Sequence, residues 1–476
     1  MVQLLGSEGE GWTFRRKLSV SCGARLESDF ESSMNARINK RLAVSVIASS
    51  LCGLLFGYDI GAISSSTQEL RTHFSLSASA LGIAVASALV GTIAGSAFAG
   101  FVADAIGRLR TLLISGALYA LAALGTAFAF GFGQFAISRF VGGVATGFIS
   151  VAAPMYLAEI APPDLRGRLV GSFQINISIG VLLGFALGYF FSLHSQNGTA
   201  WRYSMGCGAL PALLCDALLL QAVPSPRWLA LKRRFAEARN SLAAVGSIDP
   251  EADQECLAAS IRGFGALRES KLFSRRHARP ILLAAGLVIF NQLTGVNVLL
   301  YYVLDIFTEF GSGRLNGRKD AILVSAFSLV VTTVAVSVID KVGRKPLLLA
   351  GAAGMSACLI ALPAIRYMGW PATSVIVVLF CYNLFFGFSQ GTVVWVYLSE
   401  IFPLPVRARG QSFGSTVLWL TNALIVGSFP AIAIRLGRMI FVALAILMAI
   451  QCVIIFLVYP ETRHRSLETL ASNITS

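Results

Sequence analysis

The chain contains two charged motifs that each occur twice, separated by about half of its length. The motif Asp104-Ala-Ile-Gly-Arg108 recurs 236 residues later as Asp340-Lys-Val-Gly-Arg344. The motif Glu159-Ile-Ala-Pro, with arginines seven and nine residues after the glutamate, recurs 241 residues later from Glu400 with the same steps to its arginines. Two patterns that repeat at nearly the same offset indicate an internal duplication, which is typical of secondary transporters. The fold must therefore be one that two similar halves build together.

Composition indicates that these halves lie in a membrane. Hydrophobic residues make up 55% of the 476 residues and charged residues only 13%, whereas about 25% of a typical soluble domain is charged. The apolar residues form runs of about 20 residues, the length that a helix needs to cross a bilayer. We predict an all-α membrane protein with twelve transmembrane helices, six on each side of a polar stretch. The predicted spans are 43–65, 80–103, 111–130, 134–157, 169–191, 203–223, 281–309, 321–339, 346–366, 373–398, 411–433 and 437–458.

The excess of basic residues follows from the same topology. The net charge is +14, and arginines and lysines concentrate after even-numbered spans and in the polar stretch, which share one side if the spans alternate. Basic loops mark the cytoplasmic side of a membrane protein. We therefore predict a multi-pass protein of the cell membrane with both termini in the cytoplasm, surrounded by the lipid bilayer and binding no nucleic acid. Arg314, Arg318 and Lys319 are an exception, because they lie in a loop on the opposite side.

This organisation divides the chain into five segments. They are a polar N-terminal tail at 1–40, a first six-helix bundle at 41–223, a cytoplasmic helical linker at 224–279, a second six-helix bundle at 280–459 and a cytoplasmic C-terminal tail at 460–476. No Walker glycine loop, cluster of metal ligands or Ser-His-Asp order stands out in the sequence. We therefore expect no enzymatic activity, no metal and no cofactor.

A series of short motifs, in a fixed order, resembles the sugar porter family of the major facilitator superfamily. They are Asp104-x-x-Gly-Arg108, Pro154 to Glu159, Arg166-Gly-Arg168, Ser225-Pro-Arg-Trp228, Gln292 to Asn297, Asp340-x-x-Gly-Arg344, Trp395 to Glu400 and Pro460 to Arg463. Each motif alone is weak, but the ordered set over residues 41–468 is specific. The resemblance implies the major facilitator fold, in which two pseudo-symmetric six-helix bundles rock about a hexose or pentose site. The family includes bacterial sugar–proton symporters and facilitative glucose carriers.

Carboxylates and arginines at the predicted cytoplasmic ends of the spans form a candidate gate. Opposite charges at adjoining helix ends hold the helices together while this side is closed. Each pair at such a wet boundary contributes about 0.2–1 kcal/mol, so a network is needed to bias the equilibrium. The alternative is that these charges only fix the topology. The candidate gate residues are Asp104, Arg108, Glu159, Arg166, Arg168, Asp340, Arg344, Glu400, Arg407 and Glu461.

The first half departs from the family at one gate position. Similar proteins have Pro-Glu-Ser-Pro-Arg after the sixth span, whereas this chain has Val223-Pro-Ser-Pro-Arg227 and lacks the acid. The corresponding acid of the second half, Glu461, is present. We therefore expect the closed gate to be less tightly latched in the first half.

Two charged residues lie inside predicted spans. Asp59 is about six residues, or roughly 9 Å, from the outer end of the first span, and Arg139 is about five residues from the outer start of the fourth. Each charge costs about 2.5–3.5 kcal/mol at a helix centre, so at matching depth we expect the two to pair. By resemblance they occupy the proton-coupling positions of sugar–proton symporters, where protonation of Asp59 would release Arg139 and favour sugar binding or reorientation. The alternative is a permanent ion pair that only joins the two spans.

Amides and aromatic rings in the fifth, seventh, tenth and eleventh spans are candidates to bind a sugar, because sugar hydroxyls need fixed hydrogen-bond partners and a pyranose ring needs an aromatic face. Gly295 lies between the amides of the seventh span and allows a local break. The candidates are Gln174, Asn291, Gln292, Asn297, Tyr302, Trp395, Trp419 and Asn422, and all but Tyr302 and Trp419 match ligand positions by resemblance. Asn291 departs from the usual glutamine and is one methylene shorter. The alternative for each is an interhelical hydrogen bond, worth about 0.6 kcal/mol in lipid.

Asp216 is a further carboxylate inside a predicted span, the sixth, and no family motif covers it. It either faces the cavity as an auxiliary proton site or lies near the cytoplasmic end, paired with a loop arginine. Because Pro224 follows only eight residues later, we favour the second interpretation.

The sequence thus predicts a secondary active transporter, acting as a monomer, that moves a monosaccharide by alternating access together with protons. One alternative is a facilitative uniporter in which Asp59 is structural. Another is a sensor that binds sugar without transporting it. Sensors usually resemble transporters with long signalling tails, and only sixteen residues follow Pro460.

Overall fold

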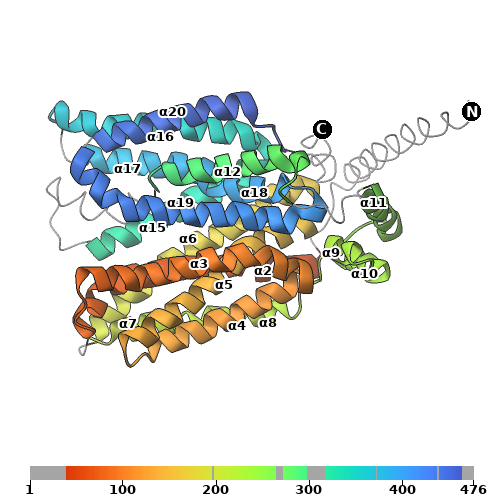
Figure 1. Ribbon diagram of the computed structural model, residues 1–476, viewed down its shortest axis with the longest axis horizontal. Helices are drawn as coiled ribbons and strands as arrows, with labels where there is room; N and C mark the ends of the chain where they lie inside the picture. The colour runs from red at the N-terminus through yellow and green to blue at the C-terminus, as the bar shows by residue number, and fades with distance from the viewer. Residues whose placement is uncertain are drawn as a thin grey trace, which may run out of the picture.

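The computed structural model describes residues 39–195, 198–263, 272–296, 317–370, 373–436 and 439–463, and the regular elements in these ranges are all helices. Figure 1 shows the long helices lying side by side in two groups, one from each half of the chain. Short helices lie beyond one end of the groups. The prediction of an all-α membrane fold is confirmed.

The helices of the first half form one group, and two of them are joined by a turn that belongs to a repeated motif. Its helices are α2 (Lys40–His73), α3 (Ala78–Ile106), α4 (Arg108–Ala127), α5 (Phe132–Ile160), α6 (Arg166–His194), α7 (Ala200–Gly206) and α8 (Ala209–Leu219). Gly107, the glycine of the first repeated motif, separates α3 from α4 with a φ of 94°. Glycine adopts this region of φ without the steric cost that a side chain imposes. The motif therefore encodes a tight turn between two spans.

The second half repeats this arrangement. Its helices are α12 (Ala278–Leu293), α15 (Gly317–Val342), α16 (Arg344–Tyr367), α17 (Thr373–Phe386), the π-helical turn η5 (Gly387–Gly391), α18 (Thr392–Glu400), α19 (Arg407–Leu436) and α20 (Met439–Val458). Gly343 separates α15 from α16 with a φ of 102°. The second motif is duplicated as well, because the short turns η1 (Pro163–Leu165) and η6 (Leu404–Val406) follow the two glutamates. The sequence repeat is thus a structural repeat.

Nine helices in the described ranges are long and apolar enough to cross a membrane, by length and composition. The other three predicted spans also coincide with helices. The span predicted at 203–223 is divided into α7 and α8 by a break at Cys207 and Gly208. The span predicted at 281–309 begins within α12 and continues into residues outside the description, and the span at 411–433 lies inside α19.

Glycines let α2 and α6 cross with their backbones nearly in contact. A Cβ atom on Gly57 would lie 1.9 Å from the carbonyl oxygen of Ile177, and one on Gly180 would lie 2.2 Å from that of Leu54. Small residues are what close helix packing in lipid requires, because lipid tails offer no hydrophobic drive for helices to associate. On the outer surface the trend reverses, since large apolar side chains such as Leu121 and Phe456, each 66% exposed, face away from the protein.

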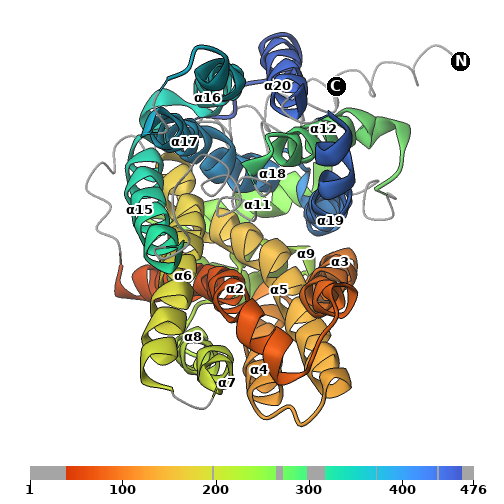
Figure 2. The same ribbon diagram turned by 90° about the vertical axis from the view of Figure 1, so that its left-hand side faces the viewer.

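The most extensive contacts between the two halves are made by two equivalent pairs of helices. In the first pair α3 packs against α19, and in the second α6 packs against α15. Counted as spans, these are the second with the eleventh and the fifth with the eighth, which is what a pseudo-twofold axis between two six-span repeats produces. Figure 2, which looks along the long helices, shows the two groups meeting at these helices.

The central polar stretch contains three helices, α9 (Pro226–Leu231), α10 (Phe235–Val245) and α11 (Pro250–Gly263). They lie at one end of the two groups of long helices (Figure 1), which we call the linker end. Asn39 connects this region to α2, because its side-chain amide donates to the carbonyl of Ala244 at 3.2 Å. Trp228 connects it to α3 by donating from Nε1 to the carbonyl of Asp104 at 3.2 Å.

Candidate functional site

The two charges inside the first half form an ion pair. Arg139 of α5 donates from Nη1 to Oδ1 of Asp59 on α2. The arginine side chain is only 5% exposed, whereas that of the aspartate is 23% exposed. The pair lines a small pocket together with Tyr58 of α2, Tyr119 of α4 and Ser138 of α5. The matching depth read from the sequence therefore corresponds to real contact, and the carboxylate is the more accessible of the two partners.

Two amides at the end of α12 belong to one hydrogen-bonded chain. Gln292 donates from Nε2 to Oδ1 of Asn291 at 2.8 Å, and Asn291 donates from Nδ2 to the carbonyl of Gln390 in η5 at 3.2 Å. Both side chains are buried. Helix α12 ends directly after them, and Gly295 has a φ of 81°. The break expected at this glycine is therefore present.

Two tryptophans of the second half reach residues of the first half. Trp395 of α18 donates from Nε1 to Oε1 of Gln174 on α6 at 2.9 Å. Trp419 of α19 lies 3.4 Å from the hydroxyl of Ser150 on α5, and its ring meets that of Phe56 edge-on at 5.2 Å. Three of the candidate sugar-binding side chains, Gln174, Trp395 and Trp419, thus lie at the contact between the halves.

The remaining candidates are distributed as follows. The Oδ1 atom of Asn422 on α19 is buried, and no described residue forms a hydrogen bond with it. Asn297 and Tyr302 lie outside the described residues. Gln390 was not identified from the sequence, although both polar atoms of its side chain are buried and lack a hydrogen-bond partner in the part of the chain that the structure describes. An amide in the middle of an apolar span was the available signal for it.

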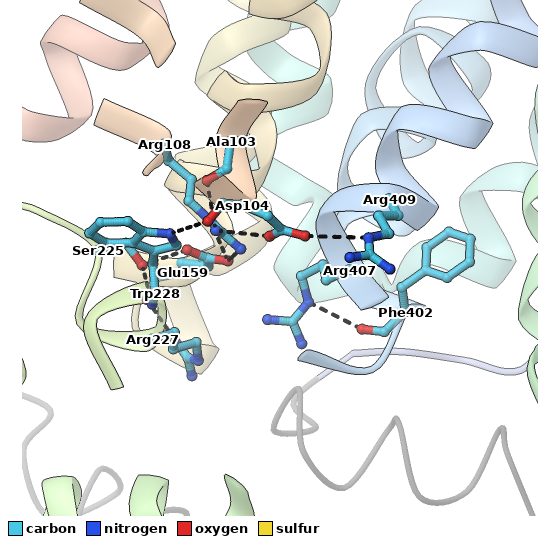
Figure 3. Close-up of polar contacts among 10 residues, drawn as sticks. All are labelled: Ala103, Asp104, Arg108, Glu159, Ser225, Arg227, Trp228, Phe402, Arg407 and Arg409. Carbon is cyan, nitrogen blue, oxygen red and sulfur yellow. Dashed lines mark hydrogen bonds and ion pairs between the residues drawn. The ribbon is translucent and has the colours of Figure 1, made fainter. Parts of the chain in front are cut away.

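The gate of the first half is built around Glu159, at the end of α5. Arg108 donates to Oε1 of Glu159 at 3.0 Å and to Oδ1 of Asp104 at 3.3 Å. Ser225 donates from Oγ to Oε2 of Glu159 at 2.5 Å, and Arg227 donates to the backbone carbonyl of the same residue. Figure 3 shows these side chains converging between α3, α4, α5 and the first linker helix. Both glutamate oxygens are therefore satisfied.

The gate of the second half repeats this geometry around Glu400. Arg344 contacts Oε1 of Glu400 at 3.1 Å and Oδ1 of Asp340 at 2.9 Å. Thr462 donates from Oγ1 to Oε2 of Glu400 at 2.7 Å, as Ser225 does in the first half. The carboxylate of Glu461 accepts from the backbone N–H groups of Arg344 at 3.0 Å and of Lys345 at 2.9 Å. Glu461 therefore caps the N-terminus of α16, where a negative charge is stabilising.

The missing acid of the first half leaves a specific difference between the two gates. The N-terminus of α4 has no side-chain cap, and Pro224 occupies the place where similar proteins have the glutamate. The hydroxyl of Ser225 nevertheless preserves the contact with the gate glutamate. The expected weakening of the first half is thus confined to the helix cap, while the serine's contact with the glutamate is retained.

Gate residues also connect the two halves directly. Asp340 on α15 accepts from the backbone N–H of Gly167 at 3.1 Å and of Arg168 at 2.9 Å, both at the start of α6. At the equivalent place Arg409 of α19 lies 3.9 Å from Oδ2 of Asp104 on α3 (Figure 3). The contact at α6 is shorter and more buried, because the Asp340 side chain is 6% exposed and that of Asp104 is 28% exposed.

Three more of the predicted gate arginines lie near these contacts. Arg407 donates from Nε to the backbone carbonyl of Phe402 at 3.1 Å, and Arg409, two residues later, approaches Asp104 across the halves (Figure 3). Arg168 contributes its backbone N–H to Asp340. Arg166 is fully buried at the start of α6. A count of charges in the sequence cannot distinguish a backbone donor from a guanidinium donor.

Comparison with known proteins gives one family over nearly the whole chain. The family model described as sugar (and other) transporter matches residues 44–473. A D-xylose transporter of Levilactobacillus brevis is 34% identical over 434 residues, which cover 89% of this chain and 94% of the relative. The structure of the proton:xylose symporter XylE bound to 6-bromo-6-deoxy-D-glucose is similar with a TM-score of 0.85 and 29% identity, covering 90% of this chain and 98% of that chain.

The same comparison protein also indicates which arrangement of the halves this structure has. The inward-open conformation of XylE from E. coli matches with a TM-score of only 0.68, although the identity is 30% and the coverage is 89% of this chain and 98% of that chain. Because sequence and coverage hardly differ between the two comparisons, the lower score reflects a different arrangement of the helices. The halves are therefore arranged as in the sugar-bound structure, consistent with the contacts that join them at the linker end.

Proposed function

This chain belongs to the sugar transporter family of the major facilitator superfamily, and from that membership we propose that it carries a monosaccharide across a membrane together with protons, by alternating access. The similar proteins are named as xylose transporters and as a proton:xylose symporter. A hexose or a pentose is therefore the substrate class. The single observation that supports proton coupling is the buried Asp59–Arg139 pair, because a membrane-buried carboxylate beside an arginine is a group whose charge a proton can switch.

In the proposed cycle the ion pair responds to protonation. Protonated Asp59 is neutral and no longer holds Arg139 by charge, so the contact between α2 and α5 weakens. This change inside the first bundle favours sugar binding or reorientation. Release of the proton restores the ion pair. The accessible side of the pair is the carboxylate, which is 23% exposed, and this supports its role as the group that exchanges the proton.

The proposed sugar site lies between the halves. The amides of α12 and the Trp395–Gln174 contact support it, because a sugar hydroxyl can replace each of these protein–protein hydrogen bonds. Asn297, Tyr302, Trp419 and Asn422 complete the proposed set. A hydroxyl that bridges Gln174 and Trp395 would connect α6 to α18, so binding would be coupled to closure of the two bundles.

We expect Gln174→Ala to raise the KM for sugar. The amide supplies one hydrogen bond to the ligand, worth about 1 kcal/mol, so the KM should increase roughly fivefold. Initial uptake rates at varied sugar concentrations measure it. Gln221→Ala is the matched control, since Gln221 is exposed and bonds within its own turn. An unchanged KM in Gln174→Ala would remove Gln174 from the proposed site.

In this proposal the linker end is the cytoplasmic end, and both termini lie on that side. The sequence divides the chain into two bundles, two tails and a helical linker. In the proposed mechanism the two bundles rock relative to each other, the linker joins them, and the protein is a monomer. Opening toward the cytoplasm requires the Asp340–α6 contact and the weaker Asp104–Arg409 contact to separate.

We expect Asp340→Asn to shift the population toward the form that is open at the linker end. The substitution weakens charge-assisted hydrogen bonds to the backbone of α6, which are worth about 1.5–3 kcal/mol. Spin labels at exposed Arg110 and Lys341, one in each half, report the change as a longer distance in electron paramagnetic resonance. Asp104→Asn is the control and should shift the distance less, because its contact across the halves is 3.9 Å long. A larger shift in Asp104→Asn than in Asp340→Asn would contradict the proposal that the Asp340 contact is the stronger of the two.

The first test of the function is uptake of radiolabelled glucose, galactose and xylose into proteoliposomes, with and without an inward proton gradient. Accumulation above equilibrium only with the gradient supports proton symport. Equilibration that ignores the gradient favours a facilitative uniporter with a structural Asp59. Binding of sugar without flux would instead favour a sensor.

A further inference from the structure

Asp216 of α8 is a carboxylate that none of the contacts described above uses. Its Oδ1 atom is buried and has no hydrogen-bond partner within the described ranges. The carboxyl group lies against α4, because a Cβ atom on Gly116 would be 2.0 Å from Oδ1 and 2.6 Å from the carboxyl carbon. Any side chain at Gly116 would occupy this space. The glycine therefore leaves room between α4 and α8 for an acid in the middle of an apolar helix.

Among the described residues, no cation forms an ion pair with Asp216. Helices α2 and α4 pack against α8. The titratable groups near this carboxyl are Cys52 of α2 and Cys215, the residue before Asp216 on α8, and the two thiols are 3.2 Å apart. On the side of α4 the carboxyl meets Gly116. Pairing with a loop arginine, which the sequence favoured, is thus not observed among the described residues.

The position of Asp216 relates it to the Asp59–Arg139 pair. Gly116, beneath the Asp216 carboxyl, and Tyr119 are three residues apart on α4 and so lie on the same face, one turn apart. Tyr119 lines the pocket that contains Asp59 and Arg139. Because α4 begins at the linker end with Arg108, Asp216 lies on the linker side of that pocket. The two acids therefore occupy the same bundle, one nearer to each end of the membrane.

We propose that Asp216 is a second proton-binding site of the first bundle, on the path between Asp59 and the linker end. A carboxylate without a partner at a helix centre costs about 2.5–3.5 kcal/mol, so binding a proton lowers the free energy of this group. It releases the proton only where an acceptor such as water is available. In the cycle it takes the proton that leaves Asp59 and releases it to water at the linker end. The assignment rests on the proposed proton symport.

Infrared difference spectroscopy of the full-length protein in liposomes tests the binding step without any transport. A protonated carboxyl group has a carbonyl band that disappears on deprotonation, and a pH titration follows it. Among the carbonyl bands that titrate in wild type, we expect one to be absent from Asp216→Asn. The same band should remain in Glu251→Gln, a control in which the replaced linker side chain is 74% exposed. If Asp216→Asn retains every titrating band of the wild type, the proposal is wrong. Asp216→Ser serves as a second neutral variant should the asparagine protein not assemble.

Transport separates this proposal from the proposed function. We expect Asp216→Asn to reduce proton-driven uptake by about a hundredfold, the lower end of what a positioned proton-transfer group contributes, while sugar exchange at equal pH stays within about twofold of wild type. Equal loss of both rates would make Asp216 a structural residue and overturn the assignment. If wild type shows no proton-driven uptake at all, the proposed symport fails, and the infrared titration still decides whether Asp216 binds a proton.

Discussion

Asp59→Asn should abolish proton-driven accumulation of sugar while leaving exchange of sugar across the membrane intact. Asparagine is neutral, like the protonated aspartate, so it keeps the shape of the side chain but can neither take up nor release the coupling proton. An imposed gradient of about one pH unit stores about 1.4 kcal/mol per proton, enough for about tenfold accumulation by wild type. The variant should reach a ratio of about one.

The measurement is steady-state accumulation of radiolabelled sugar in proteoliposomes, beside exchange at equal pH on the two sides. Asp59→Glu is the matched variant, since it retains a titratable group near Arg139, and it should keep part of the gradient response. Loss of exchange as well in Asp59→Asn, with a folded protein, would show that the Arg139 pair mainly holds α2 against α5. Gradient-driven accumulation by the asparagine variant would move coupling away from Asp59 altogether.

Arg344→Met should destabilise the protein more than any other single replacement in the gate. Its guanidinium lies between the carboxylates of Asp340 and Glu400, and all three side chains are at most 6% exposed. Removing the arginine leaves two buried negative charges facing each other. Breaking a buried ion pair in this way costs about 3–5 kcal/mol in the free energy of unfolding.

The equivalent replacement in the first half is the matched comparison. Arg108→Met also removes a fully buried arginine, but Asp104 is 28% exposed, so water can solvate one of the two carboxylates that are left without the arginine. We expect a smaller loss of stability there. Arg239→Met, which breaks an exposed linker pair with Glu251, should change stability by no more than about 0.5 kcal/mol.

Unfolding midpoints of the three purified variants in the same detergent rank these effects. The double variant Arg344→Met with Glu400→Leu should recover part of the loss, because it removes a stranded charge together with its partner. Equal midpoints for Arg344→Met and Arg239→Met would mean that the gate charges only fix the topology.

Most of the fold could be predicted from patterns that extend over the whole sequence. The twofold repeat of the gate motifs predicted two equivalent halves, and Gly107 and Gly343 form equivalent turns with φ near 100° in both. Apolar runs identified the spans because lipid requires the backbone to satisfy its own hydrogen bonds. The matching depths of Asp59 and Arg139 predicted their contact for the same reason, since a charge in lipid must find a partner.

Details of the site were less accessible from the sequence. The roles of Ser225 and Gln390 were missed, because a hydroxyl or an amide is unremarkable until its neighbours are known. Comparison of the repeats offered a signal for Ser225, which corresponds to Thr462 in its bond to the gate glutamate.

The sequence by itself determined the order of the spans, the duplication and which charged residues lie inside the spans, since these depend on hydropathy and spacing along one chain. Only the tertiary structure decided which partners meet. Asp340 contacts the backbone of α6, Arg409 approaches Asp104, and the carboxyl group of Asp216 lies against Gly116. Such contacts depend on the rotation and distance of helices that are far apart in the chain, and packing of the two halves fixes both.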